Sequence, residues 1–268
     1  MAPRAIVVDN LEKYFPPAYS GWCALLQPIA RLTLCALAGI SFSVEPGEAV
    51  AVIGENGAGK STLLRVLATL IVPTRGRAEI SGCDVERNGA GARKQLGYYT
   101  SGDEGFYGRL TGRENLRLFA AMNNLNRSQA ARRINELAEL LGLEEILDRQ
   151  ARTYSTGMLQ RLGLARSLLH APAVLLLDEP TRSLDPLAAA EFRGFLKTEI
   201  VGRLGTTLLF ASHTLSEVEE MAGRVVLLAQ GRIRAFDTPR HLCARAGAAN
   251  LQEALERLTD PSSTEHHR

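Results

Sequence analysis

One stretch, GENGAGKST at residues 54–62, constrains the fold of this chain more than any other. It fits the pattern G-x-x-x-x-G-K-[ST] and stands between a short apolar run, AVAVI, and a helix-like segment, STLLRVLATL. Glycines let such a loop curl so that backbone N–H groups point inward at a phosphate, and the helix that follows presents its positive end to the same anion. Only four of the 268 residues are lysines, which disfavours a chance match. The stretch therefore predicts a nucleotide-binding phosphate loop between a buried strand and a helix.

The positions of this phosphate loop have distinct expected roles. We expect Lys60 to reach the β- and γ-phosphates of the nucleotide and Ser61 to bind Mg²⁺ through its hydroxyl. The residues predicted to bind the nucleotide are Gly54, Glu55, Asn56, Gly57, Ala58, Gly59, Lys60, Ser61 and Thr62.

Two adjacent carboxylates, Asp178 and Glu179, end the apolar run in AVLLLDEP. Adjacent strand residues point to opposite sides, so the two carboxylates must do different jobs. In enzymes with a phosphate loop the strand-end aspartate holds Mg²⁺, and the next carboxylate is placed to orient or deprotonate the attacking water. Two solvated acids at a strand end are the alternative, and the upstream phosphate loop favours the catalytic interpretation.

His213 stands between an apolar run and a helix-like segment in LLFASHTLSEVEE. Thr214 and Glu217 have the spacing of a capping box, which accounts for the start of the helix without His213. An imidazole at the C-terminal end of a sheet is well placed to meet a γ-phosphate. A polar residue with no role beyond joining strand to helix is the alternative.

Short apolar runs alternate with helix-length segments along most of the chain. AIVVDNL, ISFSV, AVAVI and RAEISG precede a helical region, and AVLLLD, TTLLFAS and RVVLLA follow it. Within that region, SQAARRINELAELLGL predicts a helix with Ser128 as its N-cap and Gly142 as its stop, and GMLQRLGLARSLL continues the helical pattern. NLQEALERLT predicts a terminal docking helix. The alternation favours an α/β fold with a parallel sheet covered by helices.

Composition argues against several other classes of protein. The 46% hydrophobic and 22% charged residues are typical of a soluble globular chain. A net charge of +2 is too small to indicate electrostatic binding of nucleic acid. The four cysteines form no CxxC pair, which disfavours a metal or redox site. The N-terminus lacks an apolar signal core, so we expect no secretion.

Residues 21–44 carry one charge, Arg31, and are long enough to raise the question of a transmembrane span. Gln27, Pro28 and Arg31 interrupt the stretch and its second half reads as a strand, so we expect no span. Helical spacing in residues 15–33 indicates an amphipathic element, which could face a partner or the membrane, or equally pack on the chain's own surface. Its apolar positions are Trp22, Leu25, Leu26, Ile29 and Leu32.

Five motifs occur in one order along the chain: GENGAGKST, YSTGMLQR, VLLLDEP, SLD and SHT. Together they resemble the ATPase cassette of ABC transporters, from the first strand to about Asp237. The resemblance implies a P-loop NTPase fold of the ABC ATPase type, with a RecA-like parallel-sheet core, an N-terminal antiparallel β-subdomain and an inserted α-helical subdomain at about residues 103–170. It places the ATPase domain at residues 1–240, and a docking helix with a frayed tail at 241–268.

YSTGM occupies the place of the family signature LSGGQ, with threonine and methionine replacing a glycine and the glutamine. The resemblance implies that the signature contacts ATP on the phosphate loop of a second subunit through Ser155, Thr156, Gly157 and Met158. The loop that links the two sites of the dimer would be Ser183, Leu184 and Asp185. The remaining implied roles are catalytic carboxylate for Glu179, switch histidine for His213, and Mg²⁺ ligands for Ser61 and Asp178. Tyr14 lies where an aromatic usually stacks on adenine, and an ordinary strand-end tyrosine is the alternative.

The resemblance further implies an ATP-hydrolysing subunit that dimerises head-to-tail around two ATPs with Mg²⁺. It would drive transport through separate integral membrane permease subunits, two in number, and the transported substrate would contact the permease. DEPTRSLDP and YSTGM most resemble the ABC-2 exporter group, whose cargoes include drugs, polysaccharides and glycolipids. The expected location is the cytoplasmic face of a bacterial cell membrane. A soluble ABC-type ATPase that acts on a non-membrane partner is the alternative.

The stretch LGYYTSGDEGFYGRLTGRENL, at residues 96–116, lacks the glutamine that the family usually carries there. Its position falls at Ser101 or Gly102, and Asp103 or Glu104 is one alternative for its contact with Mg²⁺. We expect water or Ser101 to replace that contact instead, because a further acid beside Asp178 and Glu179 would add like charge. Phe106 and Tyr107 either line the groove that receives a membrane subunit or pack within the helical region. Thr111 and Glu114 predict a capping box.

Overall fold

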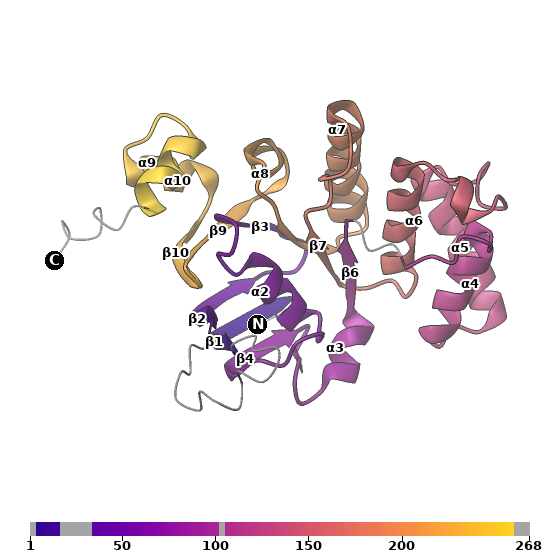
Figure 1. The fold of residues 1–268 in the computed structure, drawn as a ribbon, viewed down its shortest axis with the longest axis horizontal. Helices are drawn as coiled ribbons and strands as arrows, with labels where there is room; N and C mark the ends of the chain where they lie inside the picture. Colours follow the sequence, from indigo (N-terminus) through magenta and orange to yellow (C-terminus); the bar gives the residue numbers. More distant parts are fainter. Residues whose placement is uncertain (1–3, 17–33, 102–104, 260–268) are drawn as a thin grey trace, which may run out of the picture.

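The computed structural model describes residues 4–16, 34–101 and 105–259, and they form two sheets with helices around them (Figure 1). The antiparallel sheet has the strand order β2-β1-β4-β5, and the larger sheet has the order β10-β9-β3-β8-β7-β6. In the larger sheet β9, β3, β8, β7 and β6 run parallel, and β10 pairs antiparallel with β9 at the edge. This arrangement confirms the predicted α/β class, with its antiparallel N-terminal sheet and parallel core.

The elements follow the predicted order. The strands are β1 (Ile6–Phe15), β2 (Leu34–Val44), β3 (Ala49–Ile53), β4 (Arg75–Ile80), β5 (Cys83–Asp84), β6 (Leu96–Thr100), β7 (Val174–Asp178), β8 (Thr207–Ala211), β9 (Arg224–Ala229) and β10 (Arg232–Asp237). The α-helices are α2 (Lys60–Leu67), α3 (Gly89–Gln95), α4 (Gly112–Met122), α5 (Arg127–Leu141), α6 (Thr156–Leu168), α7 (Pro186–Phe195), α8 (Leu215–Met221), α9 (Pro239–Ala246) and α10 (Leu251–Thr259). A 3₁₀ turn, η1 (Ala151–Thr153), precedes α6, and a π-helical stretch, η2 (Leu196–Arg203), continues α7.

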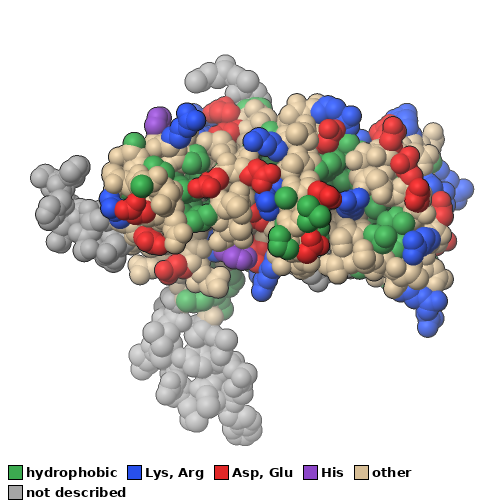
Figure 2. All heavy atoms as spheres, turned by 90° about the horizontal axis from the view of Figure 1, so that it is seen from above, with side chains coloured by type: hydrophobic (Ala, Val, Ile, Leu, Met, Phe, Trp, Pro, Cys, Tyr) green, Lys and Arg blue, Asp and Glu red, His purple; other side chains and the backbone are tan. Residues whose placement is uncertain are grey.

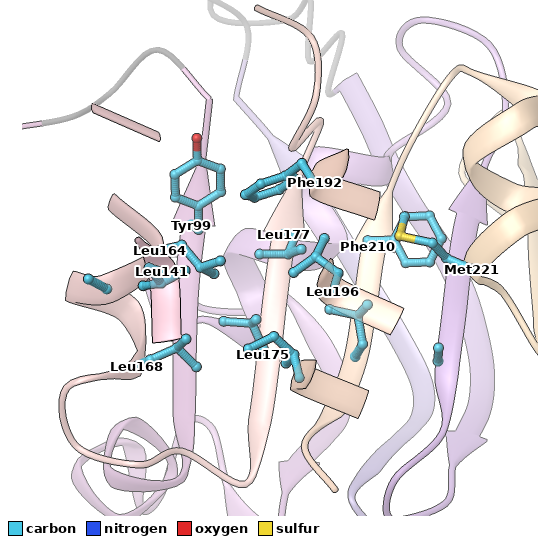
Figure 3. Packing of buried hydrophobic residues seen from close by; sticks show 14 of the residues in the cluster. Tyr99, Leu141, Leu164, Leu168, Leu175, Leu177, Phe192, Leu196, Phe210 and Met221 are labelled. Atoms are coloured by element: carbon cyan, nitrogen blue, oxygen red, sulfur yellow. The ribbon is translucent and has the colours of Figure 1, made fainter. Parts of the chain in front are cut away.

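The larger sheet is buried on both faces, which is why its strands read as unbroken apolar runs. All five residues of β3, β7 and β8 are buried. One face packs against α2 and the antiparallel sheet, through residues such as Leu63, Leu67 and Leu209. The other face packs against α6, α7 and η2, where Leu177 lies near Phe192 and Leu196 (Figure 3). Both faces therefore hold the strand ends rigidly, and the strand ends carry the predicted site.

Two predicted helix starts are wrong. Helix α5 is capped by Asn126, whose side chain accepts from the Gln129 N–H at 2.9 Å, so Ser128 lies inside the helix. Thr214 makes no side-chain cap at α8, and its N–H instead donates to Ser212 Oγ at 2.9 Å. The buried Glu217 is thereby left for contacts with the core rather than for capping.

Two predicted helix boundaries are confirmed. Gly142 ends α5 in the left-handed region, with φ of 62°. Thr111 and Glu114 form the expected capping box at the start of α4, with the Thr111 N–H donating to Glu114 Oε2 at 2.8 Å.

Within the described ranges, no helix has both the length and the apolar character that a membrane crossing requires. The amphipathic element predicted within residues 15–33 lies almost entirely outside the described residues.

Candidate nucleotide site

The phosphate loop joins the end of β3 to the start of α2, as predicted. Gly54 and Gly59 have φ of 150° and 108°, and a Cβ at these positions would lie 2.0 Å from the carbonyl oxygen of Leu228 and 2.4 Å from that of Ala36. Any larger residue would therefore push the loop away from its neighbours. Lys60 Nζ donates to the carbonyls of Gly54 at 2.7 Å and Glu55 at 3.0 Å. The ammonium thus lies folded against the loop, and burial lowers its pKa.

Ser61 and Asp178 meet although 117 positions separate them. Ser61 Oγ donates to Asp178 Oδ1 at 3.0 Å, which brings a hydroxyl and a carboxylate oxygen together beside the phosphate loop. Burial raises the pKa of Asp178, while Ser61 and the nearby Arg65 oppose that rise. Hydroxyl and carboxylate oxygens are the donors that Mg²⁺ takes at phosphate sites, so this pair fits the ion. Arg65 was not predicted, although its place one turn after Ser61 on α2 puts it on the same helix face.

Glu179 follows Asp178 in the left-handed region, with φ of 51°. Its Oε1 lies 3.5 Å from His213 Nδ1, and its Oε2 accepts from Arg182 Nη1 at 3.1 Å. The two adjacent carboxylates thus have different surroundings, but Glu179 lies just beyond β7 in the left-handed region, so the alternation of strand residues is not what separates them. Arg182 is a further site residue that sequence reasoning missed, although its spacing of three residues from Glu179 within the turn was visible.

Glu217 is an acidic residue near the site whose place there sequence reasoning missed. It is 2% exposed, and burial raises its pKa, with Arg193 and His213 opposing that rise. A hydrogen bond with Ser212 also lowers its pKa. No local pattern could have found it, because the sequence presents Glu217 as a capping residue.

The phosphate loop opens into a cavity of about 1060 Å³. Its walls come from the loop, from Ser212 and His213, and from α10 on the far side. The lining residues from β9, β10 and α10 are Leu227, Ala229, Arg234, Gln252, Leu255, Glu256 and Thr259. Tyr14 does not line this cavity; it lies on β1 opposite Cys35, and a hydrogen bond with Cys35 raises its pKa.

The signature residues lie elsewhere. Ser155 caps α6, and its Oγ accepts from the Met158 N–H at 3.3 Å. A separate cleft of about 560 Å³ is lined by Ser155, Gly157 and Met158 together with Gly142, Glu144, Glu145, Ile146 and Arg161. This signature cleft shares no lining residue with the cavity of the phosphate loop. Within one chain, the structure therefore keeps the signature and the phosphate loop apart.

The loop of Ser183 to Asp185 lies between these two regions. Asp185 Oδ1 caps α7 by accepting from the N–H groups of Leu187 and Ala188, both at 3.1 Å. Leu184 lines a small cavity together with Gly157 of the signature. The loop is thus fixed to the core at one end and touches the signature region at the other.

The end of β6 places Ser101 beside the carboxylate strand. Thr100 pairs with Asp178, and the Ser101 N–H donates to the Asp178 carbonyl at 3.3 Å. The neighbouring candidate, Gly102, lies outside the described residues. Phe106 packs edge-on against Phe119 at 5.9 Å, whereas Tyr107 is 59% exposed.

Comparison with known proteins agrees with this geometry. The family described as "ABC transporter" matches residues 37–182. The daunorubicin resistance ATP-binding protein DrrA3 of Streptomyces coeruleorubidus is 37% identical over 258 residues, which cover 95% of this chain and 75% of that protein.

Two solved structures have the same fold. The ATP-binding subunit of an ABC transporter superposes with a TM-score of 0.77 at 29% identity, covering 96% of this chain and all of that chain. The dimeric post-hydrolysis state of the ATP-binding cassette MJ0796, bound to ADP and Pi, has a TM-score of 0.72 at 22% identity and covers 87% of this chain and 98% of that one. Motifs, site geometry and relatives agree, and the chain belongs to the ABC transporter family as an ATP-binding subunit with ATPase activity.

Proposed function

We propose that this chain hydrolyses ATP as a head-to-tail dimer, in which the signature of each subunit completes the phosphate-loop site of the other. One observation carries the proposal: the signature cleft and the phosphate-loop cavity share no residue within the chain. A nucleotide that needs both must therefore lie between two copies. The dimeric form of the ADP-bound cassette MJ0796 supports the same arrangement.

The residues of the proposed site divide the chemistry among them. Lys60 leaves the loop carbonyls and pairs with the β- and γ-phosphates, and the loop N–H groups hold the phosphate chain. Ser61 and Asp178 hold Mg²⁺, which neutralises charge on the phosphates when bound. Glu179 orients the attacking water and takes its proton, and His213, 3.5 Å from that carboxylate, contacts the γ-phosphate. Ser155 and the first N–H groups of α6 meet the same phosphate from the partner subunit.

We propose that the work of this cycle is export through separate membrane subunits of the ABC-2 type. The similarity to a daunorubicin resistance ATP-binding protein supports a drug-like cargo. In this proposal the chain sits at the cytoplasmic face of the membrane, where ATP closes the dimer and hydrolysis reopens it. The permease pair, rather than this chain, contacts the cargo.

Glu179→Gln tests the proposal directly. The amide keeps the size of the side chain but cannot take a proton, so ATP should still bind while turnover stops and a dimer accumulates with ATP and Mg²⁺. Sedimentation velocity and phosphate release measure the two effects. Glu219→Gln is the matched control, because that exposed glutamate on α8 should change neither. Full ATPase activity in Glu179→Gln would refute the role of Glu179, and a strictly monomeric variant would refute the shared site.

A second arm concerns the partner. Affinity purification of the chain from its native membranes, followed by mass spectrometry, should recover integral membrane subunits in stoichiometric amount. Recovery of soluble proteins alone would favour the alternative of a soluble ATPase.

A further inference from the structure

Arg234 is an arginine that the proposed chemistry leaves unused. In the pairing of β10 with β9, Ile233 lies opposite Leu228 and Ala235 opposite Leu227, so Arg234 falls in a register shift between them. A bulge of this kind re-aims the side chain of the extra residue. Arg234 accordingly lines the phosphate-loop cavity beside Gln252 and Glu256 of α10. The bulge thus places a cation in the wall of that cavity.

The guanidinium of Arg234 is incompletely paired. Its Nε is buried and has no hydrogen-bond partner among residues 4–16, 34–101 and 105–259. A half-buried cation with an unused donor is costly unless a further acceptor meets it. Within the described ranges Arg234 also forms no ion pair, so the charge of its guanidinium remains available to an acidic group that reaches the cavity from outside the chain.

The signature cleft carries a complementary pair of charges. Glu144 and Glu145 line it beside Ser155, both are exposed, and within the described ranges neither has an ion-pair partner. They follow Gly142, whose left-handed conformation ends α5 and turns the chain toward the signature. The two carboxylates are therefore presented on the surface that the proposed function places against a second copy.

The order of elements along the molecule brings these charges together. The α9–α10 pair lies at one end in Figure 1, the helical region of α4, α5 and α6 at the other, and the phosphate loop and α7 between them. If a twofold axis sets the partner's signature over this chain's phosphate loop, the elements of the partner run in the opposite order along the dimer. The partner's α5–α6 connection then lies over the end that carries β10 and α10.

We propose that, on dimer closure, Arg234 forms an ion pair with Glu144 and Glu145 of the partner subunit. The inference rests on the proposed head-to-tail dimer and adds the contact that fixes its register. Acidic and basic side chains are interspersed over the face shown in Figure 2, with no large area of one sign. Recognition between copies therefore depends on individual pairs such as this one, which occurs twice by symmetry.

Charge reversal in the full-length Glu179→Gln chain tests the pair. With ATP and Mg²⁺, Arg234→Glu should weaken the dimer about tenfold or more in sedimentation equilibrium, because it sets like charges opposite each other. Combining E144R and E145R with Arg234→Glu should restore most of the affinity. Arg232→Glu is the matched control: this exposed arginine on the same strand bonds to the carbonyl of Ala38 and should leave the dimer unchanged. ADP affinity of the monomer should not change in the E144R, E145R or Arg232→Glu variants, because these positions do not line the phosphate-loop cavity.

The outcomes separate the inference from the function on which it rests. If the Glu179→Gln chain forms no ATP-dependent dimer, the head-to-tail proposal fails and the inference fails with it. If it dimerises, and Arg234→Glu dimerises equally well, only the inference is overturned. Weakening by Arg234→Glu without rescue by E144R and E145R also overturns the pairing. E144R and E145R alone provide a test on exposed positions that does not depend on the folding of an Arg234 variant.

Discussion

Gln160 on α6 is a buried side chain whose replacement should stabilise the protein. It is 2% exposed, and neither Oε1 nor Nε2 has a hydrogen-bond partner in the described part of the chain. It lines a cavity of about 250 Å³ between α6 and α7, whose other walls are largely apolar and include Leu141, Leu184 and Phe192. The amide thus loses its hydration on folding and gains no protein partner in return.

The size of the effect follows from that loss. An unpaired buried polar group costs about 1–3 kcal/mol, so Gln160→Met, which keeps length and helix propensity but removes the amide, should raise the free energy of unfolding by about that amount. In a chain of this size the gain corresponds to a rise in Tm of roughly 2–12 °C. Gln160→Glu should act in the opposite direction, because an unpaired charge is costlier to bury than an amide.

Urea and thermal unfolding, followed by circular dichroism, measure these differences. Gln95→Met is the matched control, since that glutamine is exposed at the end of α3 and its replacement should change stability by less than about 0.5 kcal/mol. A Gln160→Met protein no more stable than the parent would refute the reasoning. It would mean that the amide is satisfied in solution, for example by water held in the cavity.

Two further predictions concern charged groups. Burial raises the pKa of Asp178 above its ordinary value of 3.8, so ionising it costs folding free energy above that pH but not below it. Asp178→Asn should therefore stabilise the protein against urea at pH 7 and lose that advantage near pH 3; an equal gain at both pH values would contradict this cause. Arg224 Nη2 donates to Glu48 Oε2 at 2.6 Å and to the Ser43 carbonyl at 3.0 Å, and the guanidinium lies 4.3 Å from the Phe236 ring centroid. Arg224→Ala should lower the free energy of unfolding by about 2–3 kcal/mol in the same assay, and an unchanged value would show that these contacts add nothing net.

The core strands could be predicted from the sequence because each is buried on both faces. Runs such as VLLLD and TLLFA are apolar except for one residue at an end, Asp178 or Thr207, and that pattern is visible without any knowledge of the neighbours. Helix starts are harder to predict from the sequence. Near the start of α5, both Asn126 and Ser128 are residues that commonly cap a helix, and Asn126 also has Gln129 at capping-box spacing. The hydrogen bonds between Asn126 and Gln129 show that Asn126 is the cap. Thr214 and Glu217 have capping-box spacing, but no capping box forms because tertiary packing buries Glu217.

The same contrast holds at the site. The positions of Asp178, Glu179 and His213, which lie at a strand end or just beyond one, could be predicted because parallel strands end at a common edge. Glu217 could not, since its place near His213 depends on how α8 packs. Arg234 reaches the phosphate-loop cavity through a one-residue register shift, and no periodic pattern in the sequence marks a shift of that kind.

The charges around Asp178 bear on which group can take the place of the glutamine that residues 96–116 lack. The register of β6 with β7 fixes Ser101 next to this aspartate. The group that takes the place of the glutamine therefore lies beside a carboxylate whose charged form burial already disfavours. Ser61, Arg65 and Lys60 favour its charged form, and Glu179 opposes them. A further acid here would raise the pKa of Asp178 again and weaken its hold on a cation. A neutral hydroxyl such as that of Ser101, or a water beside it, avoids that penalty. We therefore expect the loop to tolerate the loss of the amide more readily than it would tolerate its replacement by a carboxylate.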